Sequence, residues 1–311
     1  MALQETHDCI YSVVDLHAIT MPYEPAKLRA NTERMVIDLL ACGIDPDKAI
    51  LFIQSLVPEH TELCWILTSL TPYGDLRRMT QFKDKRAILE SGEDSSQFVS
   101  AGIFVYPILQ AADILVYRAQ QVPVGKDQEQ HLELSRELAR RFNNQFGVDF
   151  FPEPAPLFTQ TPKVRSLMDP LKKMSKSAGE RHYIALFEDE QGVRGKIKSA
   201  VTDTGGVPGD EMSPGVANLF EILKACGKTA AVDSLMQDFN AGNLKYSRLK
   251  EVVADALVEL TSGLRERRAQ ISKDIVNVNR QVNEMSDKAR TIAAETLREV
   301  RNIIGLPPRT V

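Results

Sequence analysis

The chain has 311 residues, of which 43% are hydrophobic and 26% charged, a composition typical of a globular protein. Its net charge of −4 excludes a general basic surface for nucleic acid, so an RNA partner requires a local patch. No apolar run reaches the roughly 18 residues of a membrane span, and the four cysteines lack metal-ligand spacing. We therefore expect a cytoplasmic protein with no membrane association and no protein-held metal.

Strands and helices alternate in the first half of the chain. The apolar run CIYSVVD at 9–15 predicts a buried strand with Asp15 and His17 at its carboxyl end. A helical pattern over 25–41 follows, and AILFIQS at 49–55 predicts a second strand. This alternation favours a doubly wound parallel sheet.

The alternation continues with a helix around 61–70, a short strand at 121–125 and a further helix. That last helix has an apolar stripe at intervals of four, formed by Leu134, Leu138, Phe142 and Phe146. From about residue 183 the sequence contains amphipathic helices and little strand signal. We predict an α/β domain over 1–181 and a helical region over 182–311.

Three clusters are expected at the carboxyl ends of the strands, where ligands bind in open parallel sheets. They are residues 13–20, residues 123–131, and the KMSKS loop at 173–177. Two flexible ammonium groups in such a loop suit the phosphates of a nucleotide, although a loop with two lysines is more often simply solvated. A lone His17 is more often structural than catalytic, and His60 and His182 are interpreted as surface residues.

Several segments resemble the tryptophanyl-tRNA synthetases, a family of class I aminoacyl-tRNA synthetases. KMSKS matches the second signature of that class. Its companions, in the same order and spacing, are VVDLHAIT (13–20), YPILQAADILVY (106–117), VPVGKDQEQHLELSRELARRFN (122–143) and KIKSAVTD (196–203). The resemblance runs from about residue 3 to the C-terminus and is closest to bacterial and organellar members.

The resemblance implies a tryptophan site around Asp113, whose counterpart accepts a hydrogen bond from the indole N–H. A buried carboxylate suits indole, which has one donor and no strong acceptor. The other positions implied for tryptophan are Val14, His17, Tyr106, Gln110, Val122, Val124 and Gln128. Gln110 stands where some members have Met.

The resemblance also implies an ATP site. Its positions are Gly125, Lys126, Asp127, Lys173, Met174, Ser175, Lys176 and Ser177. Lys173, Ser175 and Lys176 are expected to hold the pyrophosphate and to act in catalysis, with Mg²⁺ arriving with ATP. Lys126 replaces an acidic residue that is frequent in the family.

The implied reaction is a tryptophan–tRNA ligase reaction, in which L-tryptophan and ATP form tryptophanyl-adenylate and tRNA(Trp) then receives the tryptophanyl group. A homodimer is implied, with the helical region reading the anticodon. Basic residues of that region that could touch RNA are Arg265, Arg267, Arg268, Lys288, Arg290, Arg298 and Arg301, although a solvated helix face is the commoner role of such residues.

The family opens with a strand, a glycine-rich turn and a His-Ile-Gly-His-like signature, and none of these is found in this sequence. We therefore expect a Rossmann-like sheet that lacks its first strand, with a gap between neighbouring strands, followed by an all-helical domain. The missing signature argues against full activity of the chain as written and favours a start downstream of it.

Two alternatives stay open. One is a non-catalytic relative that binds tRNA or a partner protein, against which the intact KMSKS, Asp113 and GKDQ segments argue. The other is a synthetase of the tyrosyl branch, which shares a Gly-x-Asp-Gln element.

Overall fold

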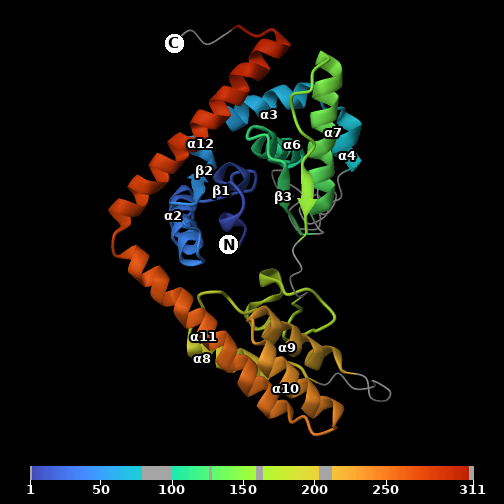
Figure 1. Ribbon diagram of the computed structural model, residues 1–311, viewed down its shortest axis with the longest axis vertical. Helices are drawn as coiled ribbons and strands as arrows, with labels where there is room; N and C mark the ends of the chain where they lie inside the picture. The colour runs from blue at the N-terminus through green and yellow to red at the C-terminus, as the bar shows by residue number, and fades with distance from the viewer. Residues whose placement is uncertain (1, 79–99, 126–127, 159–163, 203–211, 308–311) are drawn as a thin grey trace. The chain divides into compact units, whose positions relative to one another are not determined.

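The computed structural model describes residues 2–78, 100–125, 128–158, 164–202 and 212–307 (Figure 1). The chain forms two compact units. The first consists of Met1–Thr159 and Asp274–Val311, and the second of Gln160–Lys273. The last helix therefore packs with the N-terminal half of the chain. The functional boundary near residue 182 stays a prediction, because packing and function need not divide a chain alike.

The strands of the first unit pair in parallel. Strand β1 (Cys9–Val13) pairs with β2 (Ala49–Ile53) in a register that joins Cys9 to Ala49, and β3 (Gln121–Pro123) pairs with β4 (Ala155–Leu157). Over the described ranges these are two separate two-stranded sheets. The expected interruption of the sheet is thus observed. Strand β4 was not assigned from the sequence.

Helices surround these strands in the first unit (Figure 1). They are α1 (Asp15–Ala18), α2 (Pro25–Ala41), α3 (Glu59–Ser69), α4 (Tyr73–Arg78), α6 (Gly102–Leu115), α7 (Glu129–Phe146) and α12 (Ile275–Ile304), with 3₁₀ turns at Ala2–Glu5 and Gln54–Leu56. Helix α6 packs between α3 and α7. The expected stripe of α7 is confirmed, because Leu134, Leu138 and Phe142 are buried and Phe146 packs against them.

Helix α12 covers the edge of β2 that faces away from β1. The backbone N–H of Leu51 donates to Met285 Sδ at 3.4 Å, and that of Ile53 donates to Ser286 Oγ at 3.5 Å. Side chains of the helix thereby replace a strand partner, which protects an otherwise unpaired sheet edge. This packing explains why the last helix belongs to the first unit.

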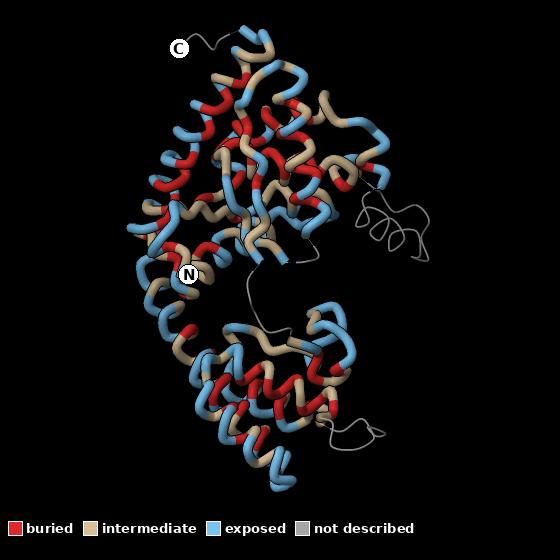
Figure 2. The backbone as a smooth tube through the Cα atoms, turned by 45° about the vertical axis from the view of Figure 1, so that its right-hand side comes forward, coloured by how far each residue is buried: buried red, intermediate tan, exposed pale blue. Residues whose placement is uncertain are grey.

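The second unit has its own core, which appears as buried segments in Figure 2. Its helices are α8 (Glu190–Ser199), α9 (Pro214–Ala225), α10 (Thr229–Asn240) and α11 (Tyr246–Ser272), with 3₁₀ turns at Lys176–Ala178 and Glu180–His182. Helix α11 packs against α8 and α9. The helical character expected beyond residue 183 is confirmed.

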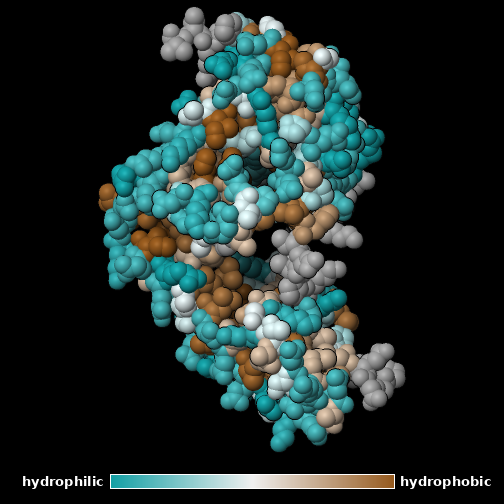
Figure 3. Space-filling view, viewed as in Figure 1, coloured by the Kyte–Doolittle hydropathy of each residue, from teal (hydrophilic) through white to brown (hydrophobic). Residues whose placement is uncertain are grey.

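The face shown in Figure 3 is mainly hydrophilic, with hydrophobic residues in separate spots. Trp65 of α3 and Tyr73 of α4 are the most exposed aromatic side chains of the described residues, at 71% and 67%. Within the same ranges, no helix combines the length and apolar character needed to cross a bilayer.

Candidate active site

Helix α6 presents a polar face that begins with Tyr106 and includes Gln110 and Asp113. Their spacing of four and three residues places them on one side of the helix, and Tyr117 follows one turn later, just beyond the helix end. The remaining surface of α6 is strongly apolar and buried. A carboxylate in this position must therefore find its partners among other polar groups within the fold.

Asp113 accepts hydrogen bonds from three side chains. His17 Nε2 lies 2.9 Å from Oδ2 and His60 Nδ1 lies 2.6 Å from Oδ1, while Gln54 Nε2 contacts both oxygens at 2.7 and 2.9 Å. His17 comes from α1, Gln54 from the turn after β2, and His60 from α3. Three separate segments thus converge on one carboxylate.

The amide of Gln54 has a defined orientation. Its Oε1 accepts a hydrogen bond from the backbone N–H of Leu16 at 3.2 Å, so its Nε2 must face Asp113. A second link joins the same two segments, because Asp15 accepts hydrogen bonds from the backbone N–H and the hydroxyl of Ser55. The segments that follow the paired strands β1 and β2 are therefore tied together beside Asp113.

His60 is fully buried, and its interpretation as a surface residue is wrong. Its Nε2 lies 2.8 Å from the Tyr117 hydroxyl, and its ring packs beside Phe52 and Tyr117. Gln54, His60 and Tyr117 were missed as site residues because their link to Asp113 depends on tertiary packing. The one sequence signal that could have found them is that these three polar residues lie in otherwise apolar segments.

The pKa of Asp113 is lowered despite its burial. Desolvation on its own raises the pKa of this carboxyl, but the hydrogen bonds and charges of His17 and His60 together outweigh it. Burial and the charges of Asp113 and Glu59 strongly raise the pKa of Tyr117, so its hydroxyl stays protonated. The site therefore holds an ionised carboxylate beside a neutral phenol.

Tyr106 extends the network towards α7. Its hydroxyl lies 3.0 Å from His131 Nε2, and its ring meets the His17 ring edge-on with centroids 6.2 Å apart. Burial raises the pKa of Tyr106. The structure thus joins Tyr106, His17 and Asp113, three of the residues predicted for tryptophan.

The other predicted positions are less closely connected to Asp113. Gln110 shares its helix face, Val14 is exposed, and Val122, Val124, Gly125 and Gln128 lie in or beside β3 and the start of α7. Lys126 and Asp127 lie outside the described residues. The roles of these positions stay predictions.

The lysine loop belongs to the second unit. Lys173 and Lys176 are exposed, Met174 and Ser175 are half-buried, and the hydroxyls of Ser175 and exposed Ser177 lie 2.7 Å apart. Gly179 ends the 3₁₀ turn of this loop with a φ of 111°, a conformation that favours glycine. The loop therefore holds two exposed lysines on a defined backbone.

Asn218 of α9 anchors the segment that precedes this loop. Its Oδ1 accepts from the Arg165 backbone N–H at 2.7 Å, and its Nδ2 donates to the carbonyls of Arg165 at 2.9 Å and Ser166 at 3.4 Å. Ser166 Oγ in turn lies 2.8 Å from His182 Nδ1. His182 is half-buried in this contact, so it is only partly the surface residue that was expected.

Two arginines named as possible RNA contacts have partners within the first unit. Arg290 pairs with Glu59 at 3.2 Å, and Arg301 pairs with Glu62, so both tie α12 to α3. Arg268 packs over the Phe187 ring at 4.7 Å. These contacts give Arg290 and Arg301 a structural role in holding the last helix.

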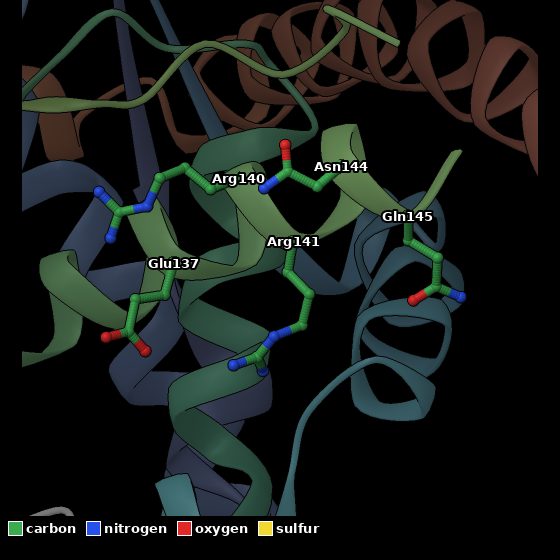
Figure 4. A pocket seen from close by; sticks show the side chains of 5 residues that line it. All are labelled: Glu137, Arg140, Arg141, Asn144 and Gln145. Carbon is green, nitrogen blue, oxygen red and sulfur yellow. The ribbon is translucent and has the colours of Figure 1, made fainter. Parts of the chain in front are cut away.

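A shallow hollow lies along α7, and its lining includes neither Asp113 nor the residues bonded to it. Figure 4 shows the side chains that line it, which are Glu137, Arg140, Arg141, Asn144 and Gln145. Arg140 pairs with Glu133 and Glu153, and Arg141 pairs with Asp75. The positive charge is thus neutralised by the protein's own carboxylates, so this hollow is a weaker candidate than the Asp113 site. Within the described ranges no cluster of His, Cys, Asp and Glu has the geometry of a metal site.

Comparison with known families places the chain among translation enzymes. Residues 1–262 match the model of the family described as tRNA synthetases class I (W and Y). The tryptophan–tRNA ligase 2 of Streptomyces avermitilis is 44% identical over 311 residues, covering 99% of this chain and 90% of that protein. The tryptophan–tRNA ligase of Corynebacterium efficiens is 43% identical, covering 99% of this chain and 88% of that protein.

Solved structures show the same similarity. The tryptophanyl-tRNA synthetase of Mycoplasma pneumoniae matches with a TM-score of 0.86 and 34% identity, covering 98% of this chain and 90% of that one. A Campylobacter jejuni tryptophanyl-tRNA synthetase, in a complex with ADP and tryptophan, matches with a TM-score of 0.80 and 30% identity over 98% of this chain and 92% of that one.

Proposed function

Because the chain belongs to the class I tRNA synthetases of the W and Y group, we propose that it is a tryptophan–tRNA ligase. The observation that carries this proposal is the buried, ionised carboxylate of Asp113, held by His17, Gln54 and His60. An ionised carboxylate only accepts hydrogen bonds, so it selects the indole N–H, and a substrate lacking that donor gains no hydrogen bond there. Tyr106, Gln110, Gln128, Val14, Val122 and Val124 complete the tryptophan site in this proposal.

The proposed reaction has two steps. The tryptophan carboxylate attacks the α-phosphate of ATP, which yields tryptophanyl-adenylate and releases pyrophosphate. The terminal adenosine hydroxyl of tRNA(Trp) then attacks the activated carbonyl, and AMP leaves. No protein nucleophile is needed, so catalysis consists of positioning the reactants and stabilising the charge that develops on the phosphates.

ATP is assigned to Gly125, Lys126 and Asp127 and to the lysine loop. Lys173 and Lys176 would supply positive charge to the pyrophosphate, with Ser175 as a hydrogen-bond donor, and Met174 and Ser177 complete the loop. Mg²⁺ arrives bound to ATP as part of that substrate. The ADP in the related Campylobacter structure supports a nucleotide site of this kind.

A homodimer is part of the proposal, as is a location in the cytoplasm, where ATP and tRNA are available. The exposed aromatic side chains of Trp65 on α3 and Tyr73 on α4 support a protein contact in the first unit. The helical part of the chain is assigned to tRNA binding.

The direct test is amino-acid-dependent exchange of pyrophosphate into ATP. We expect exchange with tryptophan and none above background with tyrosine, followed by charging of tRNA(Trp). Exchange with tyrosine alone would assign the chain to the tyrosyl branch. Binding of tRNA without exchange by any amino acid would make it a non-catalytic relative.

A further inference from the structure

The hydrogen bonds around Asp113 engage both oxygens of its carboxylate. His60 Nδ1 and Gln54 Nε2 contact Oδ1, and His17 Nε2 and Gln54 Nε2 contact Oδ2, at distances from 2.6 to 2.9 Å. These four contacts come from three nitrogen atoms, because Gln54 Nε2 is shared between the two oxygens, and an ionised carboxylate offers about four acceptor positions. An incoming N–H group therefore competes with donors that already crowd both oxygens, and it gains a strong contact by replacing one of them.

The donors differ in how readily they could give way. The side chain of His17 is 18% exposed, whereas that of His60 is 0% exposed. His60 is enclosed by the rings of Phe52 and Tyr117, at centroid distances of 5.5 and 5.4 Å. His17 is thus the replaceable donor, and His60 is the fixed one.

The two ring nitrogens of His60 have different partners. An ionised carboxylate only accepts, so the proton shared with Asp113 belongs to His60 Nδ1. The other ring nitrogen, Nε2, lies 2.8 Å from the Tyr117 hydroxyl, which fixes the orientation of the ring. A chain of hydrogen bonds thus links Tyr117 through His60 to Asp113.

We propose that His60, oriented by Tyr117, is a positioning residue that fixes the Asp113 carboxylate for recognition of the indole N–H. The inference rests on the proposed function, since it concerns the same tryptophan site. His60 does not touch the substrate in this arrangement. It acts by holding Oδ1 in place. Oδ2 is then the oxygen that gives up its hydrogen bond with His17 and accepts one from the indole N–H.

Two substitutions of His60 separate positioning from simple structural support. In His60→Asn, the amide nitrogen takes the place of Nδ1 and preserves the donor to Asp113. In His60→Gln, the amide reaches the place of Nε2, which preserves the contact with Tyr117 and removes the donor to Asp113. Both substitutions keep a polar amide in the same cavity, and circular dichroism and thermal unfolding show which of them fold.

The ligands are L-tryptophan and its benzothienyl analogue, in which sulfur replaces the indole N–H. Titration calorimetry measures their dissociation constants with the full chain. For wild type we expect much tighter binding of tryptophan than of the analogue. For His60→Gln we expect tryptophan binding to weaken about tenfold or more, the effect of one hydrogen bond to a charged group, with little change for the analogue. His60→Asn should retain most of the discrimination.

A spectroscopic measurement gives an independent reading. In ¹⁵N-histidine-labelled protein, we expect Nδ1 of His60 to carry a proton at neutral pH. Tyr117→Phe should remove the hydrogen bond to Nε2 and shift its resonance. An unprotonated Nδ1 of His60 in wild type would overturn its assignment as the donor to Asp113.

The outcomes distinguish this inference from the proposed function. If wild type discriminates against the analogue and His60→Gln weakens both ligands equally, His60 is merely structural and the inference is wrong while the function stands. If wild type shows no preference for tryptophan, both the function and the inference are refuted. Should neither His60 variant fold, Tyr117→Phe takes their place in the titrations. If the ratio of the dissociation constants for tryptophan and its analogue is then the same as in wild type, the inference is refuted.

Discussion

His17 Nε2 lies 2.9 Å from Asp113 Oδ2, which joins the end of the first strand to a helix 96 residues further along the chain. The contact brings together two of the residues singled out from the sequence. It also makes the site sensitive to the charge of Asp113, because the carboxylate is ionised in the folded protein at a lower pH than it is in the unfolded chain.

Acidification should therefore weaken the folded state through Asp113. Its folded pKa lies below the ordinary value of 3.8, so its stabilising effect is complete above that value and is lost as the pH falls through the folded pKa. We expect Asp113→Asn to lower the free energy of unfolding at pH 7 by about 1.5–3 kcal/mol, the range for hydrogen bonds to a charged group. Urea unfolding of both proteins at pH 7 and pH 3 measures this. If the wild type and Asp113→Asn differed in free energy of unfolding by the same amount at pH 7 and pH 3, the expectation would be contradicted.

The lysine loop should affect the chemical step more than tryptophan binding. Lys176→Ala is expected to slow tryptophan-dependent exchange by about 10²-fold or more, the effect of losing one preorganised group that stabilises transition-state charge. The matched control is Lys172→Ala, since Lys172 is exposed and pairs with Asp169 at 3.0 Å. Pre-steady-state adenylate formation measures the step, and equal losses in the two variants would remove Lys176 from its assigned role.

Asn218 should control the loop from a distance. In Asn218→Asp, one carboxylate oxygen still accepts from the Arg165 N–H. The other oxygen replaces Nδ2, which in the wild type donates to two backbone carbonyls, so two acceptors then face each other. We expect the KM for ATP in exchange to rise about tenfold while the dissociation constant for tryptophan is unchanged. A rise in both constants would show general damage to the protein instead.

Gly215 is required by close packing in the second unit. A Cβ at this position would meet the Val201 carbonyl oxygen and lie 2.8 Å from its carbon, and backbone atoms cannot move aside as a side chain does. We expect Gly215→Ala to destabilise the protein by about 1–3 kcal/mol. Gly195→Ala is the control, because Gly195 lies within α8 with no atom within 4 Å of the added Cβ, and alanine there should stabilise by about 0.5–1 kcal/mol. Chemical denaturation compares them, and equal effects would contradict the packing argument.

The proposed homodimer should depend on Trp65. Trp65→Glu places a charge on the most exposed aromatic side chain of the described residues and should shift the protein to monomers in sedimentation velocity experiments. Val276→Glu, at a residue of α12 that is also highly exposed, provides the control. If wild type is itself a monomer, or if both variants behave alike, this surface is not the interface.

Local patterns were enough to locate most elements of the fold. The alternation of apolar runs and helical stripes predicted β1, β2, α2, α3 and β3 close to their observed bounds, because periodicity depends only on near neighbours. The apolar stripe also predicted helix α7. The division of the described strands into two pairs also agrees with the sheet expected from the sequence. The sequence likewise singled out Asp113, His17 and Tyr106, which the structure brings together.

Only the tertiary structure showed what surrounds Asp113 and where the last helix packs. His60 and Gln54 are 53 and 59 residues from Asp113 in sequence, and Arg290 is 231 residues from Glu59, so no local pattern could connect them. Burial decides such contacts, because a polar group removed from water must be paired wherever the chain brings a partner. The sequence by itself thus determined the elements and the family resemblance, whereas packing decided that a histidine expected at the surface holds the central carboxylate.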